Sequence, residues 1–159
     1  MNEDDEFWMR RAIDAAMEAE KSDEVPIGAC LINEAGEILA IAGNRTRTDC
    51  DPTAHAEIIV LRDGAQKIGN YRLTQTTLYT TIEPCAMCAG ALIQARVKRL
   101  VFGAHDIRFG AVESVFQLCD TSSLNHQIEI TKGVLADECR SLMQQFFRRK
   151  RLSEVKSKK

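Results

Sequence analysis

The sequence contains no apolar run that approaches the roughly 18–20 residues needed to span a membrane. It also has no proline-, glycine- or serine-rich stretch, no internal repeat and no low-complexity block that would divide its 159 residues. The acidic start, Met1–Glu6, is the reverse of a basic targeting segment. We therefore expect a single domain, residues 1–159, that lies in the cytoplasm and has no membrane partner.

A disulfide framework is not expected either, although the chain has six cysteines. Such frameworks are typical of small secreted chains with poor cores, whereas 45% hydrophobic residues predict an ordinary core. Cys30 and Cys139 lie in apolar patterns and are interpreted as buried residues. The sequence indicates no role for Cys50 and Cys119. The other two cysteines belong to a motif discussed below.

The chain also lacks a large excess of either charge sign, because its formal net charge is only −2. The segment from Arg148 to Lys159 nevertheless carries seven basic residues and one acidic residue, a net of +6 that leaves −8 for the rest. A basic helix end from about residue 148 could contact RNA. The alternative is a solvated helix end whose cations complement the helix dipole, and charge alone favours this alternative.

Hydrophobic periodicity predicts helices that alternate with strands. The expected strands are 25–33, 37–44, 76–82, 98–103 and 127–131, and the expected helices are 4–20, 51 to 64 or 69, 85–95, and one from about 135. Residues 104–126 show helix-like spacing, which favours a crossover helix and a parallel pairing of the last two strands. The predicted fold class is α/β, a three-layer α/β/α sandwich around a five-stranded mixed sheet.

Two predicted helix starts carry residue types that bind metals, His55-Ala-Glu57 and Pro84-Cys-Ala-Met-Cys88. Residues at i and i+3 share a helix face, so Cys85 and Cys88 can hold one ion together. Their place in a first turn favours the thiolate form that metals require. If both helix starts meet at one sheet edge, His55 supplies a third ligand. Three protein ligands are typical of catalytic zinc, which keeps its fourth position for water.

Other uses of these residues are possible. A fourth ligand from Cys50, His105 or His126 would instead close a structural zinc site, and a Cys-x-x-Cys pair alone could be redox-active. The combination of both motifs favours catalytic zinc.

Glu57 is the carboxylate that could move protons beside such a zinc. Residues at i and i+2 of a regular helix point to different sides, which leaves two possibilities. Either the helix start is irregular at His55, or His55 and Glu57 approach the water from different directions.

These motifs resemble the cytidine and deoxycytidylate deaminase superfamily and, within it, the bacterial family of tRNA-specific adenosine deaminases. The resemblance covers nearly the whole chain. Besides the two zinc motifs it includes Val25-Pro-Ile-Gly-Ala29, Gly43-Asn-Arg45, Asn70-Tyr-Arg-Leu73, Val101-Phe-Gly-Ala104, Leu124-Asn-His126, Gly133-Val-Leu-Ala-Asp-Glu-Cys139 and Phe146-Phe-Arg148.

The resemblance implies a cytidine-deaminase-like fold with one zinc ion per chain, held by His55, Cys85 and Cys88. It implies hydrolytic conversion of adenosine to inosine at the wobble position of a tRNA anticodon stem-loop, with arginine tRNA as the expected substrate and Glu57 as the catalytic residue. A homodimer is expected on the same ground.

The resemblance also assigns residues to the substrate. Asn44 matches a base-contacting asparagine, although the residue alone is typical of a strand end or turn. Asp106 and Arg108 match a loop that flanks the anticodon nucleotides. Phe147 and the basic residues after it, Arg149 among them, match an RNA-facing last helix.

The loop His105-Asp-Ile-Arg-Phe-Gly-Ala111 departs from the family pattern, in which Arg precedes the Asp and Lys-Thr or Lys-Ser precedes the Gly. Arg108 keeps the positive charge, but Phe109 replaces a small hydroxyl residue. Phe109 could offer a stacking surface or could pack into the protein.

Two rival functions remain open from the sequence. A small-molecule deaminase acting on guanine, cytosine or a nucleoside would share the zinc motifs. A non-catalytic RNA-binding subunit with a structural zinc belongs to a different class, and Glu57 argues against it because a structural site needs no such carboxylate.

Overall fold

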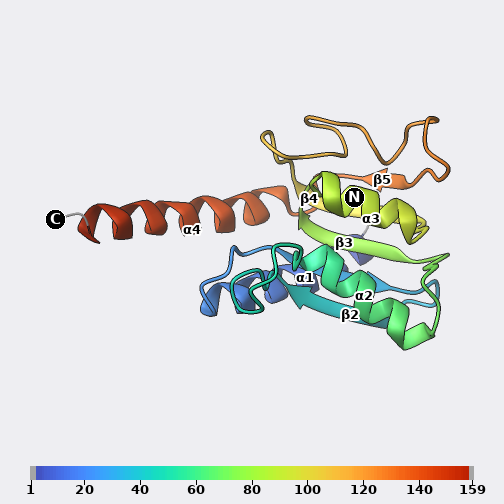
Figure 1. Cartoon of the computed structure of the whole chain (residues 1–159), viewed down its shortest axis with the longest axis horizontal. Coiled ribbons are helices and arrows are strands. Elements are labelled where there is room, and N and C mark those ends of the chain that lie inside the picture. The colour runs from blue at the N-terminus through green and yellow to red at the C-terminus, as the bar shows by residue number, and fades with distance from the viewer. Residues whose placement is uncertain (1–2, 158–159) are drawn as a thin grey trace.

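The computed structural model describes residues 3–157 and shows helices and strands that alternate along most of the chain (Figure 1). In order, the elements are α1 (Glu3–Lys21), β1 (Gly28–Ile32), β2 (Ile38–Gly43), α2 (Ala56–Ile68), β3 (Thr77–Ile82), α3 (Ala86–Gln94), β4 (Arg99–Ala104), β5 (Glu129–Thr131) and α4 (Ala136–Ser157).

The five strands form one mixed sheet in the order β2-β1-β3-β4-β5. β1 pairs antiparallel with both β2 and β3, whereas β3–β4 and β4–β5 are parallel. The five-stranded mixed sheet and the parallel pairing of the last two strands are both confirmed.

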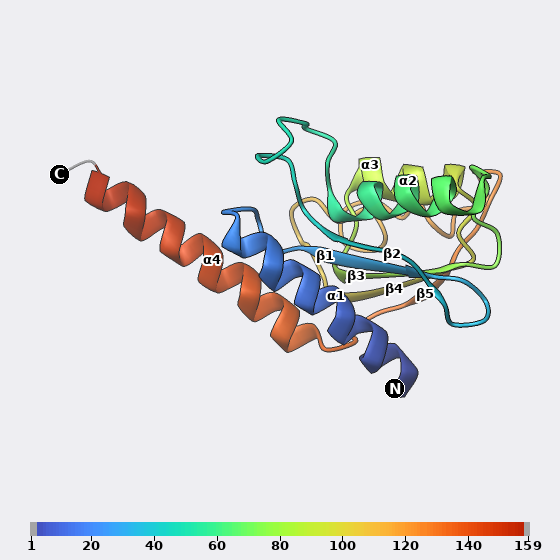
Figure 2. The same cartoon turned by 90° about the horizontal axis from the view of Figure 1, so that it is seen from below.

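Helices cover both faces of the sheet, with α1 and α4 on one side and α2 and α3 on the other (Figure 2). Because successive side chains of a strand point to opposite faces, Leu78 and Leu100 enter the core under α2 and α3, whereas Tyr79 and Val101 enter the core under α1. Cys139 lies buried in this second core, as predicted. The three-layer prediction is confirmed.

Helix α2 begins later than the sequence indicated. The Asp51 carboxylate accepts hydrogen bonds from the backbone N–H and the hydroxyl of Thr53, at 2.8 and 2.7 Å, and so closes a turn instead of capping a helix. The helix starts only at Ala56, and it ends at Gly69, which adopts φ 72° as its C-terminal cap. The predicted helix start at Asp51 was wrong.

The connection between β4 and β5 is a long loop, and the predicted crossover helix is wrong. Residues 105–128 form turns, with no helix among them. The N–H groups of Val112 and Ser114 donate to the Glu83 carboxylate rather than to carbonyls one helical turn back. The apolar spacing in this segment reflects Val112 entering the core, while Phe116 is exposed.

Helix α4 runs well beyond the edge of the sheet (Figure 1). Its first half contributes Leu142 and Met143 to the core, but Leu152 and Val155 in the second half are more than half exposed. None of the helices within residues 3–157 is long and apolar enough to cross a membrane.

A buried carboxylate fixes α1 to the sheet. Asp5 is only 2% exposed and binds Arg99 through two hydrogen bonds of 2.8 and 2.7 Å, while the Tyr79 hydroxyl donates to it at 2.9 Å. Burial alone would raise the pKa of Asp5, but the hydrogen bonds from Arg99 and Tyr79 hold it below its ordinary value.

Replacing Asp5 by Asn should lower the free energy of unfolding by about 2 kcal/mol at neutral pH, because Arg99 loses a charged, buried partner. Since the folded-state pKa of Asp5 is depressed, this contribution is present above about pH 3.9 and disappears as the pH falls through the folded-state pKa. Urea unfolding of the wild type and Asp5→Asn at several pH values measures the difference. Asp14→Asn, on the exposed face of α1, is the control. A difference that does not shrink in acid would contradict this account.

Candidate active site

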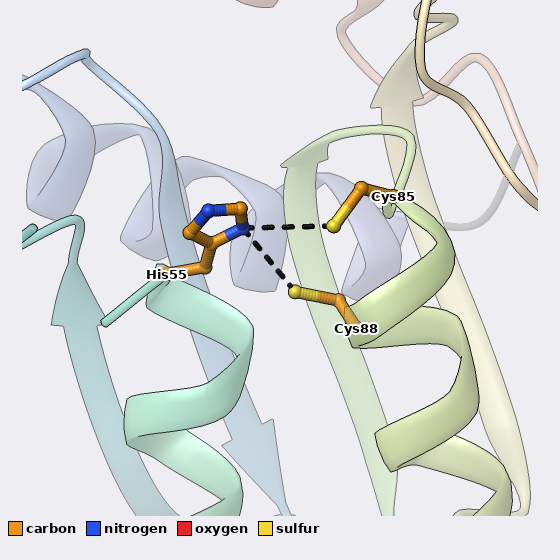
Figure 3. Close-up of side chains that lie close together, drawn as sticks. All are labelled: His55, Cys85 and Cys88. Atoms are coloured by element: carbon orange, nitrogen blue, oxygen red, sulfur yellow. Dashed lines mark hydrogen bonds between the residues drawn. The ribbon is translucent and has the colours of Figure 1, made fainter. Parts of the chain in front are cut away.

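The N-termini of α2 and α3 lie side by side at one edge of the sheet, and each begins with a residue of a metal-binding motif (Figure 3). His55 is the N-cap of α2 and Cys85 the N-cap of α3, both in extended conformation with ψ of 151° and 176°. Glu57 therefore lies inside its helix while His55 does not. The helix start is irregular at His55, which is the first of the two possibilities left by the spacing.

The three candidate ligands converge. Nδ1 of His55 lies 3.6 Å from Sγ of Cys85 and 3.5 Å from Sγ of Cys88 (Figure 3). Zinc bonds of about 2.3 Å to sulfur and about 2.0–2.1 Å to nitrogen, at the tetrahedral angle, would place nitrogen and sulfur about 3.6 Å apart. The donor set and its spacing therefore fit zinc.

None of the three residues considered as a fourth ligand lies in this cluster. Nε2 of His105 lies 2.8 Å from a carboxylate oxygen of Glu113, and Nε2 of His126 lies 2.8 Å from the carbonyl oxygen of Val97. Cys50 is exposed in a separate loop. Within residues 3–157, the His, Cys, Asp and Glu side chains form one group with metal-binding spacing, and it has three members. Among the described residues the site thus has three protein ligands, the number typical of a catalytic zinc site.

Electrostatics in the site favour a bound cation. The neighbouring Cys88 and His55 lower the pKa of Cys85 to about 4, while the neighbouring Cys85 and burial raise the pKa of Cys88. A divalent cation bound at this site would hold both sulfurs as thiolates.

Glu57 is buried beside these ligands. It is 3% exposed, and burial raises its pKa to about 7. Its Oε1 is a buried side-chain oxygen without a hydrogen-bond partner among the described residues. An unpartnered carboxylate oxygen of this kind is expected where a ligand or water completes the site.

A cavity of about 540 Å³ opens onto His55, Glu57 and Cys85. This volume lies in the range that accommodates a nucleobase or a comparable small ligand. Its other walls come from the segment before β1, the residue after β2, the end of β3, the loop after β4, and α4. The lining residues include Val25, Ile27, Asn44, Asp106, Arg108, Phe109, Arg140, Met143 and Phe147.

Comparison with known proteins agrees with this chemistry. Residues 2–104 match the family model of the cytidine and deoxycytidylate deaminase zinc-binding region. The chain belongs to this deaminase family. Its metal cofactor is therefore zinc, in agreement with the ligand spacing.

Individual relatives extend the match along the chain. A tRNA-specific adenosine deaminase of Haemophilus influenzae is 49% identical over 94% of this chain and 87% of its own. A solved tRNA:A34 deaminase, from work on A-to-I editing at the wobble position, is 41% identical with a TM-score of 0.82 and covers 86% of this chain and 98% of its own. A guanine deaminase from Nitrosomonas europaea is 25% identical with a TM-score of 0.78, over 89% and 83%.

Asn44 of this deaminase lies at the end of β2 and is 6% exposed. Its Oδ1 accepts a hydrogen bond of 2.8 Å from the N–H of Ala56, the first residue of α2. Asn44 therefore caps the helix that positions His55 and Glu57, and its side chain also lines the cavity. Asn44 follows a strand end, as the residue type alone indicated, and its contact with the substrate base stays a prediction.

Asp106, Arg108 and Phe109 lie together on the loop after β4, on the cavity wall. Oδ1 of Asp106 accepts the N–H groups of Arg108 and Phe109, at 3.1 and 3.2 Å, and so fixes a turn. The Phe109 side chain is 66% exposed. Of the two possibilities for Phe109, packing into the protein is wrong.

Phe147 reaches the cavity from α4 and is 42% exposed. Arg149 lies outside the cavity, in a groove between α1 and α4, where it forms an ion pair with Glu20. Lys150 next to it donates to Asp23 at 2.6 Å. The basic end of α4 is thus partly neutralised by acidic groups near the end of α1, and Lys158 and Lys159 lie outside the described residues.

Sequence reasoning assigned no role to Glu83, which precedes the zinc motif directly. This carboxylate is 3% exposed and accepts hydrogen bonds from the loop after β4. Burial alone would raise the pKa of Glu83, but these hydrogen bonds, led by that of Ser114, hold it below its ordinary value. No local pattern marks such a residue, since its partners lie more than 20 positions away.

Proposed function

We propose that this deaminase converts adenosine to inosine at the wobble position of a tRNA anticodon. The observation that carries the proposal is the agreement with tRNA-specific adenosine deaminases over nearly the whole chain, 49% identity over 94% of it. The reaction consumes one water and releases ammonia, as hydrolytic deamination requires. An open three-ligand zinc site beside a buried carboxylate is the arrangement that this chemistry needs.

We assign the metal to His55, Cys85 and Cys88. When bound, zinc supplies Lewis acidity that makes a water molecule nucleophilic near neutral pH. Glu57 would take one proton from the attacking water and pass it to the purine ring, and would then move the second proton, from the hydroxyl group formed at C6, to the amino group that leaves as ammonia. Its burial and unpartnered Oε1 suit this role, because a buried carboxylate oxygen without a protein partner is free to accept a proton from water and release it to the substrate.

We assign recognition of the target base to Asn44. Its Oδ1 is held by the N–H of Ala56, so its amino group is the part left to donate to an acceptor on the base. Because the same hydrogen bond caps α2, the base contact and the catalytic carboxylate are fixed relative to each other.

Groups beyond the base pocket favour a nucleic-acid substrate. Arg108 and the exposed rings of Phe109 and Phe147 line the cavity mouth, where they can contact phosphates and stack on flanking bases. Asp106 belongs to the same loop and is assigned to the flanking nucleotides. Arg148 and Arg151 are exposed at the end of α4 and in none of the described ion pairs, so they suit a longer-range contact better than Arg149 does.

We further propose that residues 1–159 form one deaminase domain, that it works in the cytoplasm as a homodimer, and that its substrate is arginine tRNA. The outer face of α2 and α3 supports the dimer, because a groove there is lined mainly by apolar side chains, with Ile58, Leu61 and Ala91 among them. The exposed Tyr71 beside this groove would be covered by a second copy. Residues 1–2 and 158–159 lie outside the described part.

A second candidate function is deamination of a free base. The likeness to a guanine deaminase, with a TM-score of 0.78, and a cavity of about 540 Å³ favour it. A free-base enzyme would have no use for the exposed aromatic and basic groups around the cavity mouth.

Glu57→Gln should retain zinc and the fold but lose deamination by about 10²–10⁴-fold, since the amide cannot carry the proton. Inosine formation and bound zinc are measured on the same preparation, with Glu34→Gln in the exposed β1–β2 turn as control. Near-normal turnover by the zinc-loaded Glu57→Gln variant would move the proton role to another residue.

The substrate proposal predicts that an anticodon stem-loop with a wobble adenosine is deaminated far faster than free adenosine, guanine or cytidine. A loop base is already partly unstacked, so little energy is spent on extruding it. Incubation with a set of tRNAs, followed by mapping of inosine, should identify the wobble position of arginine tRNA. Faster turnover of any of the free compounds would favour the second candidate.

A further inference from the structure

The Glu83 carboxylate is the centre of a hydrogen-bonded connection between the zinc motif and the cavity wall. Glu83 follows β3 and stands two residues before Cys85. Its Oε2 accepts three consecutive backbone N–H groups, those of Val112, Glu113 and Ser114, at 3.1, 2.8 and 2.9 Å. Successive N–H groups of this kind form an anion-binding nest.

The other oxygen of Glu83 holds the start of the same loop. Its Oε1 accepts the N–H of Asp106 at 3.1 Å and the Ser114 hydroxyl. The loop from 106 to 114 is therefore fastened at both ends to one buried carboxylate. Its tip, with Arg108 and Phe109, points to the cavity mouth.

Two further features show that the backbone is built around this carboxylate. A Cβ added to Gly110 would lie 2.3 Å from Cδ of Glu83, so a larger residue cannot occupy that position without displacing the carboxylate. The N–H of Ala111 donates to the carbonyl of Pro84 at 2.8 Å. The loop is thus held against the segment that leads into the zinc ligand Cys85.

We propose that Glu83 is a positioning residue for the substrate, which acts by holding loop 106–114 at a fixed distance from the zinc motif. The inference rests on the proposed function, because it assigns the loop's Asp106, Arg108 and Phe109 to the nucleotides beside the target base. A glutamine at position 83 would present one oxygen and one amino group to five donors. It would leave part of the nest without an acceptor and release the loop.

The direct test is amide hydrogen exchange in the zinc-loaded protein. In Glu83→Gln the amides of Val112, Glu113 and Ser114 should exchange at least about tenfold faster, while zinc content and exchange in the sheet stay at wild-type levels. Glu129→Gln, an exposed carboxylate on β5, is the matched control. Unchanged exchange at the three loop amides would overturn the inference.

Kinetics separate positioning from general stabilisation. Glu83→Gln should raise KM for an anticodon stem-loop by about 10- to 100-fold and change kcat less, because loosened flanking contacts weaken binding. A general loss of folded protein would lower kcat and zinc content and leave KM unchanged. The effects of Glu83→Gln and Arg108→Ala should be less than additive, since both act through one loop. Additive effects would overturn the inference.

If Glu83→Gln does not fold, Gly110→Ala tests the same contact from the loop side and should shift exchange and KM in the same direction. The two proposals fail differently. A wild-type protein that does not deaminate the stem-loop contradicts the proposed function and leaves the exchange result valid. An active wild type whose loop amides ignore Glu83→Gln contradicts the inference alone.

Discussion

The site depends on one constraint, the meeting of the N-termini of α2 and α3 at the same edge of the sheet. This brings His55 within 3.6 Å of Cys85 and 3.5 Å of Cys88, although the residues lie 30 or more positions apart in the sequence. Both helix starts also direct the positive end of a helix dipole at the ligands, which favours thiolates and a nearby anion. A shift of either helix by one turn would separate the ligands by about 5.4 Å and destroy the site.

Two buried carboxylates hold the loops on either side of this edge, and both accept hydrogen bonds from backbone N–H groups and hydroxyls instead of from Lys or Arg side chains. Glu83 binds the loop after β4, and Glu24 accepts hydrogen bonds from the backbone and hydroxyl of Thr48 at 2.7 and 2.6 Å. The second loop leads from β2 to His55. Loops that carry binding groups need such internal support, because they lack the regular hydrogen bonding of helices and strands.

The sequence allowed the sheet, the four helices and the metal ligands to be predicted, since apolar periodicity and the Cys-x-x-Cys spacing are local signals. The start of α2 was misplaced, because an Asp such as Asp51 can either cap a helix or close a turn. In the structure Asp51 closes a turn, and the distant Asn44 caps the helix instead. A helix was also predicted after β4. The N–H groups of this segment donate to the distant Glu83 carboxylate instead of to helical carbonyls, and no local sequence signal shows that. The long-range contacts that shape the site were therefore the part beyond prediction.

The central claim is that zinc binds to three protein ligands and keeps one position open. X-ray absorption at the zinc edge of the metal-loaded protein, together with metal content per chain, tests it most directly. The account predicts one zinc ion per chain with two sulfur ligands, one imidazole and one oxygen from solvent. A fourth cysteine or histidine ligand, or a zinc shell without both sulfurs, would contradict it.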